Sequence, residues 1–135
     1  MIEVLVATAI VGIVFVSLIG GFTWGFTLVR LARENVRAAQ ILQEKTETLR
    51  LYNWDQINTP GFIPTNFTAA FDPTSPSTGV IYTGTVVVTD APVTESYSNT
   101  LRQVIVEVGW TAGKINRNRR MSTFVSRYGL QNYIY

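Results

Sequence analysis

An uncharged segment near the start of the sequence constrains this chain more than any other feature. Residues 4–29 read VLVATAIVGIVFVSLIGGFTWGFTLV, with Glu3 on one side and Arg30 on the other. As an α-helix rising about 1.5 Å per residue, this apolar segment is long enough to cross a hydrocarbon layer of about 30 Å. A carboxylate at the mouth of such a helix costs roughly 2.5–3.5 kcal/mol if it lies deep in lipid. We therefore expect Glu3 to have a partner and a role.

The apolar segment differs from a cleaved secretion signal. Such signals begin with basic residues, continue with about 7–15 apolar residues and end at small residues. Here the first charged residue is acidic, the apolar core is about twice too long, and the helical pattern continues beyond it. A plain single-pass membrane anchor explains the same pattern and stays open as an alternative.

The composition excludes several kinds of site. The 135 residues include no Cys and no His, which excludes disulfides, thiolate sites, Ser-His-Asp triads and imidazole metal sites. The net charge of +2 is too small to indicate a nucleic-acid partner by itself. The acids after the helix are scattered singly and form no recognisable catalytic pair: Asp55, Asp72, Asp90, Glu95 and Glu107. We expect no enzyme activity, no metal and no cofactor.

The helical pattern continues after Arg30 but becomes amphipathic. One stripe of apolar and small residues recurs at a spacing of three or four: Leu28, Ala32, Val36, Ala39, Leu42, Thr46 and Leu49. No Pro precedes Pro60, so one helix is predicted from the start of the chain to about residues 52–55, about 80 Å long. The sequence Thr59-Pro60-Gly61 prevents any continuation.

Four glycines lie inside the apolar segment, at positions 12, 20, 21 and 25. Each weakens a helix by about 1 kcal/mol relative to Ala. Small residues allow close contact between helices, which is the interpretation for Gly12 and Gly25. The adjacent pair Gly20-Gly21 is the best candidate for a place where the helix unwinds. The two interpretations are compatible and both stay open.

The remaining sequence predicts a loop and then a small antiparallel sheet. Residues 60–79 hold four of the five prolines and many Ser and Thr, which indicates a loop. Strands are predicted at residues 80–89, 101–110 and 121–128, with a hairpin loop over residues 111–118. The apolar face of a three- or four-stranded sheet needs a cover, and the stripe on the amphipathic helix supplies it.

These elements predict an α+β fold in which a long N-terminal helix packs on a small antiparallel sheet of three or four strands. Residues 1–29 form the membrane or filament-core helix, residues 30–59 the amphipathic half, and residues 60–135 the loop and sheet of a globular head. The predicted contact between helix and sheet joins six residues: Val36, Ala39, Leu42, Val106, Val108 and Trp110.

The opening residues carry a family resemblance. Met1-Ile2-Glu3-Val4-Leu5-Val6-Ala7 resembles the class III signal region of type IV pilins and type II secretion pseudopilins. In that region a peptidase cuts after Gly, and a hydrophobic run with Glu at its fifth place follows. The C-terminal stretch VIVEVGWTAGK…MSTFVSRYG looks like the last hairpin of pseudopilins and minor pilins. The match is tight over Ile-Glu-Val-Leu-Val-Ala and architectural elsewhere.

The resemblance implies a role for several residues. Glu3 aligns with the family's assembly glutamate, which pairs with the N-terminal amine of a neighbouring subunit. Gly12 falls where pilins often carry Gly, and Gly20 where many carry a helix-breaking Pro. The implied function is a structural subunit that waits in the bacterial inner membrane and then polymerises into a surface or periplasmic filament. Its implied partners are further copies of itself, a prepilin peptidase and an assembly platform.

The chain departs from the family pattern in two respects. The basic leader with its Gly and the first two residues of the expected mature chain are absent, so we expect a trimmed or mis-started sequence. The Cys pair that closes a C-terminal loop in many pilins is also absent. In addition, Arg30, Arg33 and Arg37 follow the apolar segment, and the positive-inside rule would keep the head in the cytoplasm. A basic leader upstream would restore the balance.

Three other functions compete with the pilin. A type II secretion pseudopilin builds a short periplasmic piston from the same plan, and a membrane-anchored binding module would never polymerise. DNA binding is suggested only by a basic cluster expected on the loop before the last strand: Lys114, Arg117, Arg119 and Arg120. No aromatic platform accompanies this cluster, so we expect a solvent-facing or inter-subunit surface and no nucleic-acid site.

Overall fold

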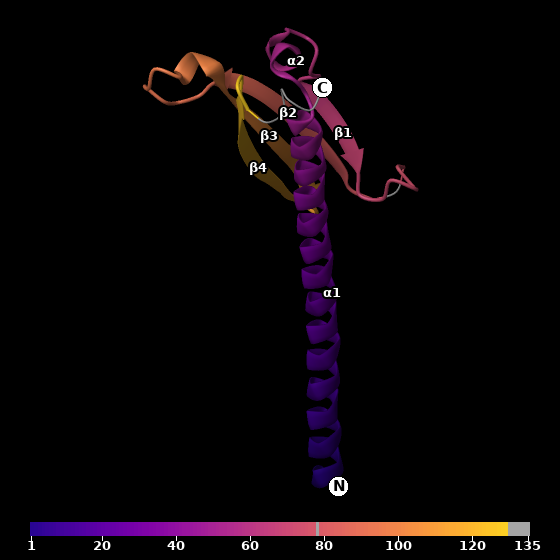
Figure 1. Cartoon of the computed structure of the whole chain (residues 1–135). Coiled ribbons are helices and arrows are strands. Elements are labelled where there is room, and N and C mark those ends of the chain that lie inside the picture. Colours follow the sequence, from indigo (N-terminus) through magenta and orange to yellow (C-terminus); the bar gives the residue numbers. More distant parts are fainter. Residues whose placement is uncertain (78, 130–135) are drawn as a thin grey trace. The chain divides into compact units, whose positions relative to one another are not determined.

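The chain forms one long helix, one short helix and four strands in the computed structural model, which describes residues 1–77 and 79–129. The helices are α1 (Ile2–Arg50) and α2 (Trp54–Asn58). The strands are β1 (Asn66–Ala70), β2 (Ile81–Asp90), β3 (Leu101–Ala112) and β4 (Ile115–Ser126), with a 3-10 turn at Ser98–Thr100 before β3. Figure 1 shows these elements along the chain. The architecture is α+β, as the sequence predicts.

The chain divides into two compact units at Arg33. The first unit, residues 1–33, holds the apolar part of α1. The second unit begins at Glu34 and holds the last turns of α1, the short helix and the sheet. We call this second unit the head. The predicted extent of the head to residue 135 includes a tail, residues 130–135, that lies outside the described residues.

Helix α1 ends at Arg50, before the predicted end at residues 52–55. The reason is a second helix start at Asn53, whose Oδ1 accepts the backbone N–H of Gln56 at 2.9 Å. The Gln56 side chain accepts the backbone N–H of Asn53 at 3.0 Å in return. This reciprocal capping box satisfies donors at the start of α2 and favours a new helix over continuation of the old one.

The sheet is an antiparallel meander in the order β1-β2-β3-β4. Strand β1 lies inside residues 60–79, which the prolines indicated as a loop, so that expectation is wrong for Asn66–Ala70. In the register of β1 on β2, Phe67 lies opposite Gly84. A side-chain atom at Gly84 would lie only 2.1 Å from the Phe67 ring, so the absence of a side chain there makes room for the ring. The pairing of Phe67 with Gly84 is thus a specific contact of the edge strand β1, which the sequence pattern does not predict.

Strands β3 and β4 are joined by a tight turn instead of the predicted loop over residues 111–118. The pairing continues to Ala112 opposite Ile115, which leaves only Gly113 and Lys114 in the turn. Gly113 adopts a φ of 65°, a left-handed conformation that two-residue hairpins require and that glycine adopts at little cost.

The core of the head lies between one face of the sheet and the last turns of α1. Alternate residues of the central strand β3 are buried: Val104, Val106, Val108, Trp110 and Ala112. Val86 and Tyr82 of β2 and Val125 of β4 are buried beside them. Each step of two residues returns to the same face of a strand, and this periodicity places the buried set against the helix.

The helix meets this face with a different stripe from the predicted one. The buried residues of α1 are Glu34, Ala38, Ile41, Leu42, Thr46 and Leu49. Leu42 therefore lies in the core, whereas the prediction is wrong for Val36, which is 58% exposed, and for Ala39, which is also exposed. The two stripes share Leu42, Thr46 and Leu49 but diverge towards the start of the head, because Ala38 and Ile41 lie towards the sheet there.

Candidate functional site

The apolar segment of α1 is the most distinctive surface of the first unit. Every side chain from residue 1 to residue 30 is exposed in the single chain. The most apolar stretch of 18 residues in this helix has a mean hydropathy of 2.6, and none of it is buried. By length and composition, the helix is therefore able to cross a membrane. Such an exposed apolar surface needs a cover of lipid or of other apolar helices.

All four hydroxyl groups of the apolar segment are satisfied within the helix. Ser17 donates to the Ile13 carbonyl at 2.8 Å, and Thr23 and Thr27 donate in the same way, each at 2.9 Å, to the carbonyls of Ile19 and Thr23. Thr8 donates to Val4 and Leu5. Because unsatisfied polar groups are costly in hydrocarbon, these bonds suit the segment to a dry environment.

Glu3 lies in the first turn of α1 and is exposed. Its negative charge complements the positive end of the helix dipole. No other charged side chain occurs before Arg30. Its own helix offers no cationic side chain before Arg30, so in an apolar environment this carboxylate would strongly attract a cation from another chain.

The four glycines of the apolar segment leave open notches on the helix surface. A side-chain atom built at Gly12, Gly20, Gly21 or Gly25 meets nothing within 4 Å. Gly21 and Gly25 are four residues apart and therefore share a face, where another helix could approach closely. The helix is unbroken at Gly20-Gly21 in this single chain. The predicted unwinding concerns the assembled state and stays a prediction.

The basic cluster lies on a strand and not on a loop. Only Lys114 occupies the turn, whereas Arg117, Arg119 and Arg120 belong to β4. Arg119 Nη2 donates to Asn35 Oδ1 on α1 at 3.4 Å. Arg120 lies opposite Glu107 in the register, and Asn118 Nδ2 donates to Glu107 Oε1 at 3.0 Å. We call Lys114, Arg117, Arg119 and Arg120 the basic hairpin.

A buried polar group lies where α1 enters the head. Tyr82, which is fully buried, donates its hydroxyl to the Glu34 carbonyl at 3.0 Å, and its ring packs 5.6 Å from that of Trp110. Burial, together with the charge of Glu34, raises the pKa of Tyr82 to about 12, although Arg37 opposes the shift. Glu34 itself is only 2% exposed. Glu34 does not belong to the stripe predicted to face the sheet, yet it is one of the buried residues of α1.

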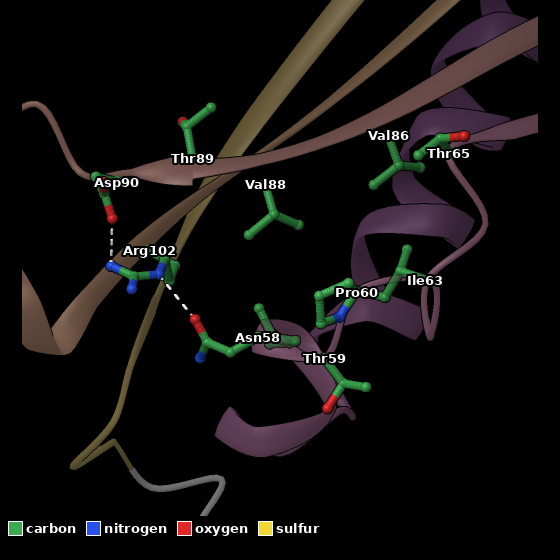
Figure 2. Close-up of a pocket in the computed structure, with 12 residues that line it drawn as sticks. Asn58, Thr59, Pro60, Ile63, Thr65, Val86, Val88, Thr89, Asp90 and Arg102 are labelled. Atoms are coloured by element: carbon green, nitrogen blue, oxygen red, sulfur yellow. Dashed lines mark hydrogen bonds and ion pairs between the residues drawn. The ribbon is translucent and has the colours of Figure 1, made fainter.

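A cavity of about 380 Å³ lies between α2 and the sheet in the head. Figure 2 shows Ile63, Val86 and Val88 towards its apolar side and Arg102 at its polar end. Arg102 contacts Asp90 at 2.5 Å and donates to Asn58 Oδ1 at 2.8 Å, and its guanidinium lies 5.4 Å from the centre of the Trp54 ring. Arg102 therefore ties α2 to two strands, which is a structural role.

Within residues 1–77 and 79–129, no group of three or more acids, His or Cys could hold a metal ion. The site residues predicted on the head separate into two sets: Leu42, Val106, Val108 and Trp110 are buried together, while Val36 and Ala39 face outward. The features that stand out are therefore surfaces, namely the apolar segment with Glu3 and the basic hairpin.

Comparison with known proteins adds no assignment. No protein-family model, no curated protein and no solved structure matches this chain.

Proposed function

We propose that this protein is a pilin, a structural subunit that polymerises through α1 into a type IV pilus or a related extracellular filament. The observation that carries the proposal is the joint occurrence of Glu3 with an exposed apolar segment on a helix whose last turns cover a four-stranded antiparallel sheet. This plan is compatible with a pilin-like fold. The opening sequence Ile2-Glu3-Val4-Leu5-Val6-Ala7 supports the same proposal through its resemblance to the pilin signal region.

The proposed mechanism follows from the chemistry of the apolar segment. In the inner membrane, lipid covers the segment, and in a filament the same surface is covered by neighbouring copies. Apolar contact is kept in both states, so transfer from lipid to filament need not expose the helix to water. Gly12 and Gly25 allow neighbouring helices to approach closely. A prepilin peptidase and an assembly platform act on the chain in this scheme.

Glu3 sets the register of the assembled subunits in this proposal. Its carboxylate pairs with the N-terminal amine of the adjacent copy inside a bundle of low dielectric constant. A subunit placed out of register would leave that charge without a partner, at a cost of several kcal/mol. The pair therefore selects one arrangement more than it adds net stability.

The test replaces Glu3 with Gln, which keeps the shape of the side chain and removes its charge. The matched control is Glu47→Gln, the same change at an exposed acid of the same helix. We expect sheared surface filaments to fall at least tenfold for Glu3→Gln and to stay normal for Glu47→Gln, with both variants still inserted in the membrane. Tenfold corresponds to about 1.4 kcal/mol, below the expected cost of an unpaired buried charge.

Two alternatives give different outcomes in the same experiment. A pseudopilin of a type II secretion system would also depend on Glu3 but would build short periplasmic filaments, so filament length and neighbouring genes distinguish it. A membrane-anchored binding module would tolerate Glu3→Gln. Normal filament numbers in this variant would overturn the register role.

A further inference from the structure

The position of the basic hairpin in the head can be derived from contacts within the head. Tyr82 near the start of β2 bonds to Glu34, whereas Val86, further along β2, lines a small cavity together with Leu49. Strand β2 therefore runs along the helix from its entry into the head towards Arg50. We call the end of the sheet near Glu34 the entry side and the opposite end the far side. Strand β3 is antiparallel to β2, so β3 ends at the entry side, and the turn at Gly113 and Lys114 lies there.

A second contact places β4 at the same side. Arg119 bonds to Asn35, which is only six positions after Val29, the last residue of the apolar segment. Six residues of chain span at most about 20 Å. The polar region on each side of a bilayer is about 5–7.5 Å thick, because the total thickness is about 40–45 Å and the hydrocarbon core about 30 Å. When lipid covers the apolar segment, this short connection keeps Asn35, and the Arg119 side chain bonded to it, within reach of the lipid headgroups.

The charged side chains of the head are distributed unevenly between the entry side and the far side of the sheet. No acid follows Glu107 in the sequence, whereas the basic hairpin supplies four cations. Asp90 lies at the end of β2 and is bound to Arg102, and Glu95 lies in the connection to β3, both at the far side of the sheet. Of the nearby acids, Glu107 lies opposite Arg120, and Glu34 is buried.

One further acid lies on the entry side. Asp72 follows β1, the opposite edge strand, three strand spacings or about 14 Å from β4. The Thr74 hydroxyl and backbone N–H both donate to the Asp72 carboxylate. The β4 edge of this side is therefore positively charged, and Ile115 next to the turn adds an apolar side chain that is 61% exposed. Cations that flank an exposed apolar side chain are typical of surfaces that bind anionic membranes.

We propose that the basic hairpin binds the phosphates of anionic phospholipids when the chain is anchored by its apolar segment. Long Lys and Arg side chains reach headgroups while their stems stay on the protein surface. The contact holds the head against the membrane until the chain leaves the bilayer. It depends on insertion of the apolar segment but not on polymerisation, so it goes beyond the proposed function.

The experiment uses the full chain inserted singly in lipid nanodiscs. Because the chain has no Cys, Ile115→Cys gives one attachment point for a fluorophore at the hairpin, and Thr94→Cys gives a control on the exposed connection at the far side of the sheet. Lipids with a nitroxide on the headgroup report proximity by quenching. Discs are made of phosphatidylcholine, with or without about one-third phosphatidylglycerol.

We expect strong quenching at position 115 only in the anionic discs, and weak quenching at position 94 in both. Raising NaCl from about 0.1 M to about 1 M shortens the Debye length from about 10 Å to about 3 Å and should release the hairpin. Lys114→Gln with Arg120→Gln should lower the ratio of bound to free heads about 25-fold, or about fivefold per cation. The control pair Lys45→Gln with Arg50→Gln, at the other end of the head helix, should leave this ratio unchanged.

Three outcomes would overturn the proposal. The first is equal quenching at position 115 in neutral and anionic discs. The second is an equal loss of quenching in the control pair of variants. The third is a loss of duplex DNA binding in Lys114→Gln with Arg120→Gln without any change in lipid quenching, which would assign the hairpin to nucleic acid. Flotation of each variant with vesicles verifies insertion separately, and filament counts report on polymerisation independently.

Discussion

At the scale of single residues, Tyr82 links the helix to the sheet through one hydrogen bond in a buried setting. The phenol donates to the Glu34 carbonyl, and burial with the nearby Glu34 charge raises the pKa of Tyr82 to about 12 from an ordinary value of 10.0. A raised pKa means that the folded state holds the proton more tightly than the unfolded state. The stabilisation is fully present below about pH 10 and is lost as the pH rises through about 12.

This linkage predicts a pH-dependent difference between the wild type and Tyr82→Phe. The variant should be less stable by about 1 kcal/mol at neutral pH, because it loses the hydrogen bond to Glu34. Between pH 10 and 12 the free energy of unfolding of the wild type should fall more steeply than that of the variant. Urea titrations in detergent, followed by near-UV circular dichroism, measure both. Tyr97→Phe, at an exposed tyrosine, should follow the wild type throughout.

Gly84 predicts a second effect at a single position. The Phe67 ring occupies the space that a side chain at position 84 would need. Gly84→Ala must therefore displace that ring and should lower the free energy of unfolding by about 1–3 kcal/mol. Gly109→Ala is the matched control on the adjacent strand, because its nearest contact is at an ordinary 3.7 Å. Phe67→Leu combined with Gly84→Ala should recover part of the loss. Equal stability of the two alanine variants in urea titrations would contradict the proposed steric role.

At the scale of elements, the sequence predicts strands better than it predicts the direction of a helix face. The alternation of Val104, Val106, Val108 and Trp110 leaves one choice of face, and all four are buried. A helix with small residues on several sides offers more than one face that could pack on the sheet. Thr46, Leu42 and Leu49 fit both the predicted and the observed stripe, and the difference arises where Ala38 and Ile41 replace Ala39 and Val36.

The remaining differences have local causes that single-residue propensities do not reveal. In strand β1, Phe67 packs over Gly84, a partner that lies opposite in the register but 17 positions away in the sequence. Glu34 is buried next to Tyr82, whose hydroxyl donates to the Glu34 carbonyl, and this partner is 48 positions away in the sequence. The early end of α1 could have been found, because Asn53 and Gln56 have the spacing of a capping box. The sequence predicts the basic hairpin on a loop because the strand pattern before it ends at Trp110, whereas the pairing of β3 with β4 continues to Ala112 and Ile115.

The corrected helix face predicts a contrast between two neighbouring positions. Ile41→Ala should destabilise the head by about 2–5 kcal/mol, because its side chain is 1% exposed and its removal leaves a cavity. Val36→Ala should change stability by less than about 0.5 kcal/mol, because that side chain faces outward. Thermal or urea unfolding of the full chain in detergent measures both. The opposite order would restore the stripe first predicted from the sequence.

At the scale of the whole molecule, the chain combines two units with opposite surfaces. The head buries its apolar side chains between helix and sheet, whereas residues 4–29 leave theirs exposed. A protein that keeps such a segment exposed depends on an external apolar environment. Two features suit both candidate environments, lipid and neighbouring helices. The hydroxyl groups of the segment are hydrogen-bonded within the helix, and its glycines have open surroundings.

The glycine pair distinguishes those two environments and gives a final prediction. The single chain is helical through Gly20-Gly21, and a side-chain atom at either position meets nothing within 4 Å. Gly20→Ala with Gly21→Ala should therefore be accommodated in the membrane-inserted chain and should strengthen the helix by up to about 1 kcal/mol per position. If assembly requires unwinding at this pair, the added helix stability opposes it, and filament numbers should fall severalfold while membrane insertion stays normal. A map of wild-type filaments provides the direct measurement, because unwinding removes backbone bonds between residues four apart around the pair. An unbroken ladder of these bonds from Val11 to Arg30 in the filament would refute unwinding, and any loss of filaments in the variant would then reflect close packing of the helices at Gly21.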